Sequence, residues 1–162
     1  MAPKSGYVGL MALGPGDIVS QCMKEGDLRL EFLEFVTHPV HKAPAYYFRM
    51  VHALTGEKLG GINLRVGSTP HLELYAGHVG YSVEPAHQGH RYAARSLRLL
   101  IPIAQQLGFE ALWITCDPEN AGSQRSAELA GAEFVEIVDV PEHCIIHQSG
   151  HKQKCRYRLA VH

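Results

Sequence analysis

The chain has 162 residues, of which 46% are hydrophobic and 19% are charged, and its formal net charge is −1. A chain of this length buries one full core but is too short for two comfortable domains, so we expect a single domain over residues 1–162. The near-neutral charge argues against a general binder of nucleic acid or of a membrane surface, and we expect neither as a partner.

Residues 1–27 show little hydrophobic pattern and several breakers, which predicts a loosely structured N-terminal arm. The longest apolar run in this arm, residues 7–13, is too short to span a bilayer or to serve as a secretion signal. Four cysteines occur along the chain, at Cys22, Cys116, Cys144 and Cys155. Because their spacing is not that of a disulfide framework, we expect reduced thiols and a cytoplasmic protein.

Four segments in the first half have the alternation, or the aromatic and β-branched content, of strands. They are residues 28–36, 45–54, 58–66 and 78–83. The alternation of the first segment shifts at Phe32-Leu33, which predicts a β-bulge. Turn residues at 55–57 reverse the chain, and residues 67–76 are expected to form a loop. This order predicts an antiparallel meander.

From Tyr92 the hydrophobic period becomes helical, and Gly108 is expected to end the helix as a left-handed cap. The apolar residues on one side of this helix are Ala93, Leu97, Leu100, Ile101, Ala104 and Leu107. Pro102 lies within the helix and should kink it, because proline removes one backbone hydrogen bond.

The second half alternates strands with helices. Residues 111–116 form a buried-looking strand, after which Asp117 and Pro118 are expected to open a second helix that ends near Ala130. Residues 134–140 and 154–161 are expected to be the last strands. The fold class is therefore α/β, an antiparallel meander followed by β-α-β-α-β and a final strand. A right-handed crossover should make strands 78–83 and 111–116 parallel, with ligands bound where they diverge.

A glycine-bearing loop, Gln88-Gly89-His90-Arg91, leads directly into the first helix. The first amide groups of a helix have no intrahelical partners and lie at the positive end of its dipole, so they can bind an anion such as phosphate. Arg91, Arg95 and Arg98 follow on one helical face and would make this seat cationic. As a bare pattern, the same loop is also consistent with a tight turn of no further function.

Two stretches in this order resemble a known family. GYSVEPAHQGHRYAARSLRLL resembles motif A of the GCN5-related N-acetyltransferase (GNAT) superfamily, in the form seen in small bacterial-type members. DPENAGSQRSAELAGAEF resembles the next element of that family, in which an Asn opens a helix, a Ser or Ala follows three residues later, and Gly-x-x-Phe closes it. These features match Asn120, Ser123 and residues 131–134, and the resemblance covers about residues 59–134.

The resemblance implies an N-acetyltransferase that moves an acetyl group from acetyl-CoA to a primary amine of an unidentified small molecule or protein. It leaves room for a homodimer and implies no metal. The pantetheine arm would pair with the backbone near Ser82 and Val83, and Asn120 and Ser123 would hold the arm or the adenylate side. The pyrophosphate would lie on the amides of Gln88, Gly89, His90, Arg91, Tyr92 and Ala93.

The chain departs from the family pattern at two places. The family loop usually begins with Gln or Arg and ends with Gly or Ala, whereas this chain has Ala86 and Arg91 there. The Arg91 side chain would either crowd the phosphate or bind it directly. Many members carry a tyrosine general acid on the second helix, and the matching residue here is Ala127. A tyrosine acid is therefore not carried over.

Acetylation of an amine needs a proton acceptor, and we expect His78 to supply it as the general base. The strand alternation puts His78 on one face with Gly80 and Ser82, beside the expected thioester arm; the alternative is a surface histidine on a strand. Glu73 is the reserve candidate, followed by Glu84. Cys116 ends the buried strand and is expected to be an inert thiol.

Two further patterns lie near the C-terminus. Cys144, His147, His151 and Cys155 are potential zinc ligands, although their spacing matches no familiar zinc module. Lys152, Lys154, Arg156 and Arg158 alternate along the last strand, where a solvated face is the default expectation and contact with the CoA 3′-phosphate or an acidic substrate is the alternative. The rival functions are accordingly a non-catalytic CoA- or nucleotide-binding module on the same fold and a zinc-dependent interaction protein.

Overall fold

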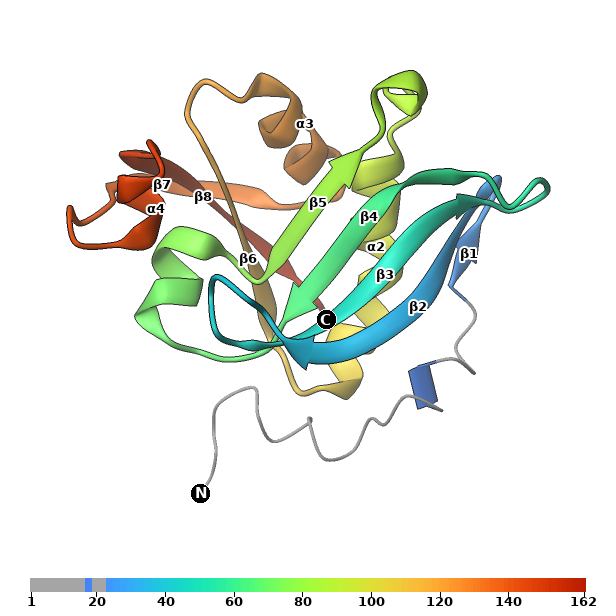
Figure 1. Ribbon diagram of the computed structural model, residues 1–162, viewed down its shortest axis with the longest axis horizontal. Coiled ribbons are helices and arrows are strands. Elements are labelled where there is room, and N and C mark those ends of the chain that lie inside the picture. The colour runs from blue at the N-terminus through green and yellow to red at the C-terminus, as the bar shows by residue number, and fades with distance from the viewer. Residues whose placement is uncertain (1–16, 19–22) are drawn as a thin grey trace.

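The computed structural model of the chain describes residues 17–18 and 23–162 (Figure 1). The expectations for residues 1–16 and 19–22, including the reduced thiol at Cys22, lie outside the described residues. In the described part of the expected arm, Ile18 is buried in the core and residues 24–25 form a short strand. This part of the arm is packed and not loose.

The first sheet is an antiparallel meander with the strand order β1-β2-β3-β4-β5. Its strands are β1 (Lys24–Glu25), β2 (Leu28–Thr37), β3 (Pro44–His52), β4 (Lys58–Arg65) and β5 (Val79–Val83). The predicted bulge is confirmed, because the β2–β3 register shifts between Phe32 and Glu34. The meander predicted from hydrophobic alternation is therefore correct, with β1 added at its edge.

The segment between β4 and β5 is not only a loop, as the sequence pattern predicted. It contains the π-helix η2 (His71–Ala76), which ends at Gly77 with a φ of +77°. A Cβ atom added at Gly77 would lie 3.0 Å from the carbonyl oxygen of Trp113. Glycine is required here because the backbone has a left-handed φ and passes directly against the backbone of Trp113.

Helix α2 (Tyr92–Gln106) follows β5 and the short 3-10 helix η3 (Pro85–His87), and Figure 1 shows it lying across one face of the first sheet. Its buried residues include Leu97, Leu100 and Ala104, as the helical spacing predicts. Pro102 lies inside it, and Gly108 follows its end with a φ of +91°. The helix and the sheet share one hydrophobic core.

The second sheet has three strands in the order β6-β8-β7, all antiparallel to their neighbours. The strands are β6 (Ala111–Cys116), β7 (Glu133–Asp139) and β8 (Gln153–Ala160), joined through α3 (Ala121–Leu129) and α4 (Ile145–Gln148). The prediction that Asp117 caps α3 is wrong: the cap is Asn120, whose side-chain oxygen accepts a hydrogen bond from the Ser123 N–H at 3.0 Å. The Asp117 carboxylate instead faces His151.

Strands β5 and β6 do not form the continuous parallel ladder that the crossover predicted, because they belong to different sheets. They are joined at one point, where the His78 N–H donates to the Trp113 carbonyl at 2.7 Å and the Trp113 N–H donates to His78 Nδ1 at 3.0 Å. The next ladder bond would run from the Thr115 N–H to the His78 carbonyl, but that carbonyl accepts from the Arg65 N–H at 2.7 Å instead, so the ladder stops there. Beyond this point the two strands diverge (Figure 1).

His78 is 2% exposed, and its Nε2 also bonds to the Gly67 carbonyl at 2.9 Å. Burial lowers the pKa of His78 from 6.5 to about 4. Between those two values an unfolded chain binds a proton that the folded protein does not bind. The contribution of the neutral, buried His78 ring to the stability of the folded protein is therefore complete above pH 6.5, and it is lost as the pH falls toward about 4.

We expect His78→Gln to lower the free energy of unfolding near neutral pH by about 1–3 kcal/mol, because one amide cannot satisfy all the groups that the ring satisfies. The variant should also lose less stability than the parent as the pH falls from 6.5 to 4. Chemical denaturation across that range measures both effects, with His143→Gln, at an exposed position, as the matched control. Equal stability and equal pH slopes in parent and variant would contradict this assignment.

Candidate active site

A cleft of about 530 Å³ lies where β5 ends, between the 84–91 loop, the start of α2, and α3. It brings together every residue expected to bind the cofactor except His90. The predicted residues that line it are Ser82, Val83, Gln88, Gly89, Arg91, Tyr92, Ala93, Asn120 and Ser123. Segments about 30 residues apart in sequence thus form one surface, which we call the cofactor cleft.

The loop that forms one wall of the cofactor cleft has the backbone of an anion seat. Gly89 has a φ of +94° and Arg91, the N-cap of α2, has a φ of +62°. No side chain caps this helix. The amide groups of its first turn are therefore available to a ligand, with the positive end of a 15-residue helix behind them.

The arginines of this helix do not all serve the cleft, contrary to the sequence prediction. Of the three, only Arg91 lines it. Arg95 forms ion pairs with Glu25 at 2.5 Å and with Asp27 at 2.6 Å, and it contacts the Tyr92 ring. Its hydrogen bond, with that of Tyr92, holds the pKa of Asp27 below its usual value. Arg95 fastens the β1–β2 turn to α2, which helical spacing alone does not reveal.

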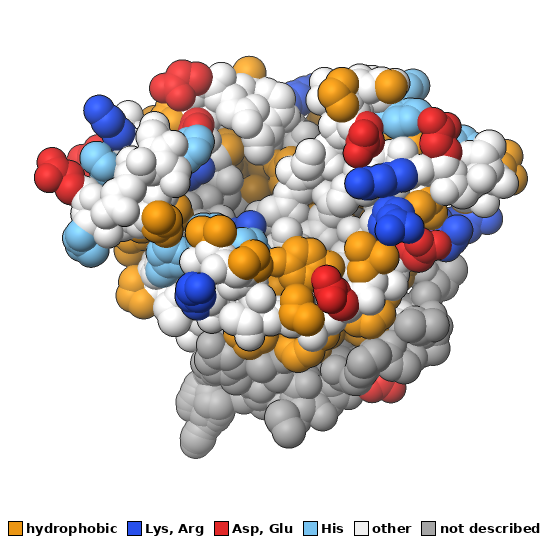
Figure 2. Space-filling model, in the orientation of Figure 1, with side chains coloured by type: hydrophobic (Ala, Val, Ile, Leu, Met, Phe, Trp, Pro, Cys, Tyr) orange, Lys and Arg blue, Asp and Glu red, His pale blue; other side chains and the backbone are white. Residues whose placement is uncertain are grey.

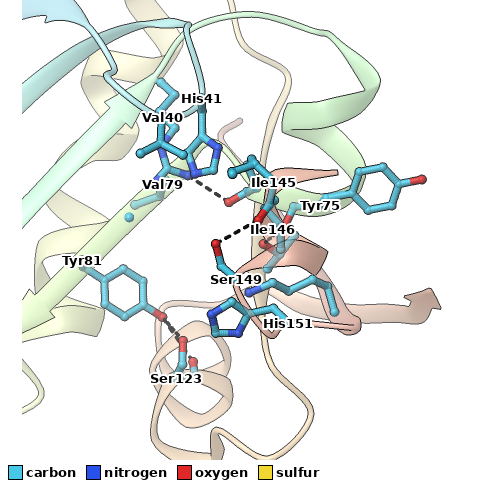
Figure 3. Close-up of a pocket in the computed structure, with 15 residues that line it drawn as sticks. Val40, His41, Tyr75, Val79, Tyr81, Ser123, Ile145, Ile146, Ser149 and His151 are labelled. Carbon is cyan, nitrogen blue, oxygen red and sulfur yellow. Dashed lines mark hydrogen bonds between the residues drawn. The ribbon is translucent and has the colours of Figure 1, made fainter. Parts of the chain in front are cut away.

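A second cavity of about 350 Å³ lies on the other side of Tyr81, between β5, η2, α4 and β8, and we call it the inner cavity. Tyr81 and Ser123 line both cavities, and their hydroxyl oxygens are 2.8 Å apart (Figure 3). The remaining wall combines apolar side chains such as Val40, Tyr75 and Ile146 with basic ones. Figure 2 shows that the surface is hollowed between the part of the molecule built on the first sheet and the part built on the second sheet.

His78 and Glu73, expected as base and reserve base, line a third cavity with Gly67, Trp113 and Arg158. That cavity shares no lining residue with the cofactor cleft or the inner cavity. The alternation counted His78 as part of the strand, but β5 begins at Val79 and His78 belongs to the buried turn before it. Both of its ring nitrogens already have hydrogen-bond partners, so His78 joins the turn before β5 to Gly67 and to Trp113 of β6.

The surroundings of Glu84 and Cys116, the other two residues considered for catalysis, do not favour a catalytic role. Glu84 is paired with Lys58 at 3.6 Å. Cys116 is 4% exposed, and burial raises the pKa of its thiol to about 11. The thiol is therefore protonated at neutral pH and is a weak nucleophile.

His151 and Asp117 form a pair that sequence reasoning missed. The His151 Nδ1 lies 2.6 Å from Asp117 Oδ2, and Lys154 Nζ lies 3.0 Å from Asp117 Oδ1. Burial raises the pKa of Asp117, but the contacts with Lys154 and His151 outweigh it and the net shift is downward. The ionised carboxylate accepts the Nδ1 proton, so the lone pair lies on Nε2. His151 lines the inner cavity, and this is the arrangement of a general base and its orienting carboxylate.

A second histidine in the inner cavity, His41, has a different environment. Its Nδ1 lies 2.8 Å from Nε2 of His71, and the Cys144 sulfur lies 3.8 Å from Nδ1 of His71. Burial lowers the pKa of His41 to about 3, so its ring is neutral at physiological pH. A ring with such a low proton affinity is a poor proton acceptor for an amine.

The four potential zinc ligands are not gathered into a site. Within residues 17–18 and 23–162, no group of three or more His, Cys, Asp or Glu side chains could hold a metal ion. His151 is paired with Asp117, and Cys155 is buried on β8 opposite Cys116. The hypothesis of a zinc-dependent interaction protein has no support in this geometry.

The alternating cations of β8 are not a uniformly solvated face. Arg156 is 7% exposed, lies 4.0 Å over the Trp113 ring, and forms an ion pair with Glu136 at 2.6 Å. It also donates two hydrogen bonds to the Glu73 carbonyl. Arg156 therefore joins β8, β6 and η2, and the prediction of a solvated strand face is wrong at this position.

The family model of the acetyltransferase (GNAT) domain matches residues 21–133. The chain belongs to the GNAT acetyltransferase family. The family and the fold class inferred from the two sequence motifs are thereby confirmed. A search of the curated proteins finds no match, and no helix in the described part of the chain is long and apolar enough to cross a membrane.

Solved structures share the GNAT fold. An acetyltransferase of the GNAT family from Bacillus anthracis is 18% identical, with a TM-score of 0.57, over 71% of this chain and 66% of that one. Ribosomal-protein-S5-alanine acetyltransferase from Vibrio fischeri is 18% identical, with a TM-score of 0.55, over 72% and 62%. Ribosomal L7/L12 alpha-N-protein acetyltransferase in complex with CoA is 17% identical, with a TM-score of 0.55, over 72% and 62%. The chain thus spans less than two thirds of the length of these proteins.

We expect a chelator to leave the melting temperature unchanged, because the described residues assemble no metal-binding group. Thermal unfolding with and without EDTA measures this, together with the metal content of protein purified without added metal. Stoichiometric zinc that is lost in a Cys144→Ser variant would overturn the expectation.

Proposed function

We propose that the protein transfers an acetyl group from acetyl-CoA to a primary amine of a small molecule or protein. The observation that carries this proposal is the meeting of two cavities at Tyr81 and Ser123, in the gap between the diverging strands β5 and β6. The GNAT domain match supports it, as does the solved GNAT structure that contains CoA. The two cavities suit a donor and an acceptor that approach each other from opposite sides.

The cofactor cleft would hold acetyl-CoA. Strand β5 pairs with β4 on one edge, and its other edge has no ladder partner among the described residues. Backbone groups near Ser82 and Val83 on that free edge are available to the pantetheine arm. The first turn of α2, with Arg91, would bind the pyrophosphate, while Asn120 and Ser123 lie across the cleft from it.

The inner cavity would hold the acceptor, with His151 as the proton acceptor in place of His78. The amine nitrogen attacks the thioester carbonyl carbon and loses a proton to His151 Nε2, and the carbon–sulfur bond then breaks. The leaving thiolate needs a proton. Burial raises the pKa of the Tyr81 hydroxyl, which therefore stays protonated at the junction of the two cavities and would supply that proton. Tyr81 would thus act as the general acid, in place of the tyrosine that many family members carry at the position of Ala127.

A non-catalytic CoA-binding module is the second candidate, favoured by Ala127, which is fully buried and brings no hydroxyl to the site. Acetyl-CoA turnover against a panel of amines separates the two functions. Because two of the solved neighbours act on ribosomal proteins, the panel should include peptide N-termini beside small amines.

The cysteine chemistry supports a reducing compartment such as the cytoplasm. Cys116, Cys144 and Cys155 are free thiols, and all three are buried. Free buried thiols persist where the cellular redox poise is reducing.

We expect CoA to raise the melting temperature of the parent, because a ligand that binds only the folded state stabilises it by mass action. Gly89→Asp should abolish this shift, because it puts a carboxylate at the phosphate seat. Gly89→Ala is the matched control: it brings the same strain at a φ of +94° without the charge, and a Cβ atom there meets no atom within 4 Å. Thermal shift assays with CoA measure the effect, and a Gly89→Asp variant that binds CoA like Gly89→Ala would remove the phosphate seat from the proposal.

We expect His151→Asn to lower acetyl-CoA turnover by roughly 10²–10⁴-fold, the usual contribution of a positioned base. Asparagine retains a donor for Asp117 but lacks Nε2, so the CoA-induced shift in melting temperature should not change. His147→Asn, on α4 but outside the cavity lining, is the control. If His151→Asn retains more than about a third of parental turnover, His151 is not the base.

A further inference from the structure

Arg65, the last residue of β4, is a buried cation. It is 7% exposed, and its Nη1 donates hydrogen bonds to the Ala76 and Gly77 carbonyls at 2.9 and 3.0 Å. Within the described residues no carboxylate lies within ion-pairing distance of it, and its buried Nε has no hydrogen-bond partner. A buried charge without a counter-ion destabilises the folded protein, so a charge kept at such a position calls for an anion.

The chain makes room for this guanidinium at the junction of the cavities. A Cβ atom added to Gly80, on β5, would lie 2.3 Å from Nη2 of Arg65. Nη2 thus occupies the space that a side chain at position 80 would take, next to Tyr81. Arg65 and Gly80 line the inner cavity and a neighbouring cavity of about 580 Å³ over strands β3, β4 and β5, and neither lines the cofactor cleft. The cation therefore lies outside the cofactor cleft and borders the inner cavity.

The charges around the inner cavity are unbalanced. Its lining contains Arg65 and Lys154, His151 and the neutral ring of His41, and none of its lining side chains is a carboxylate. Asp117 balances His151 and Lys154 from outside the cavity lining. Among the described residues, Arg65 is left as the cation with no carboxylate partner, and the cavity that it lines has an apolar wall that includes Val79 and Ile146 (Figure 3).

We infer that Arg65 binds a carboxylate of the acceptor, so that the substrate is an amine that carries its own carboxylate a few atoms away. A guanidinium N–H pairs with a carboxylate through a charge-assisted hydrogen bond. Capping the carbonyls of η2 uses only Nη1, which leaves Nη2 for this role, while Nε is covered by protein atoms. The cavity volume of about 350 Å³ suits a small amino acid or the first residue of an acidic peptide. This inference rests on the proposed function and narrows its substrate class.

The test uses matched acceptors that differ in one carboxylate: β-alanine and propylamine, phenylalanine and phenethylamine, and peptides beginning with Asp or Asn. With acetyl-CoA saturating, we expect the carboxylated member of at least one pair to have a kcat/KM at least about 10-fold higher. Arg65→Gln should remove most of that preference, chiefly through KM, and should change the kcat/KM of the neutral member little. Arg65→Lys should retain part of it, because a lysine keeps the charge without the planar geometry.

Gly80→Ala tests the same point without removing the charge, because its methyl group displaces Nη2. It should lower the carboxylate preference, while Gly61→Ala, whose added Cβ lies 3.6 Å from its nearest neighbour, should not. Equal kcat/KM for both members of every pair in the parent would overturn the inference. An equal loss for charged and neutral acceptors in Arg65→Gln would overturn it too, since that result shows no specific contact between Arg65 and the carboxylate.

The failure of the proposed function has a different signature. A parent protein that shows no CoA-induced thermal shift, or that acetylates no amine in the panel, contradicts the proposed acetyl transfer itself. A parent that acetylates amines without regard to the carboxylate contradicts only the inference about Arg65.

Discussion

Two hydrogen bonds between His78 and Trp113 hold the two sheets together at one point, and the shape of the site depends on them. One is an ordinary backbone bond, while the other uses an imidazole as the acceptor. Because the His78 carbonyl accepts from the Arg65 N–H of β4 and not from the next amide of β6, pairing stops and the strands separate. The free edges of β5 and β6 then face a gap instead of each other.

The turn that carries this join is held from several sides. Gly77 lets the chain approach Trp113 closely, and Arg65 caps the carbonyls of Ala76 and Gly77. On the other side, Arg156 stacks on the Trp113 ring and bonds to η2 through the Glu73 carbonyl. Each of these cations would be costly if left alone in the interior, and Arg156 is balanced by Glu136.

Features carried by neighbouring residues were predictable from the sequence. The bulge at Leu33 follows from a shift in alternation, and the ends of α2 follow from its period and from Gly108. The loop at Gln88–Arg91 is likewise local, because one glycine followed by an amphipathic helix defines it. A motif match then connected it with Asn120 and Ser123, which lie on the facing wall of the cleft.

Features made by distant residues were not predictable. His151 and Asp117 are 34 positions apart and meet only because β8 lies beside β6. The sequence pattern therefore predicts a helix cap at Asp117, and it indicates for His151 no role beyond that of a potential zinc ligand. His78 was placed on an open strand face by alternation, although it belongs to the buried turn before the strand. Arg95 shared a helical face with Arg91, but its partners lie about 70 positions earlier in the sequence.

The position of the join at one end of the gap has a mechanical consequence. The two His78–Trp113 hydrogen bonds lie at one end of the gap between β5 and β6. A small change in the angle between the strands at this end therefore corresponds to a larger displacement at the far end, where Tyr81 meets Ser123. The width of the gap between β5 and β6 is therefore set by the atoms of His78 and Trp113, which lie outside both cavities.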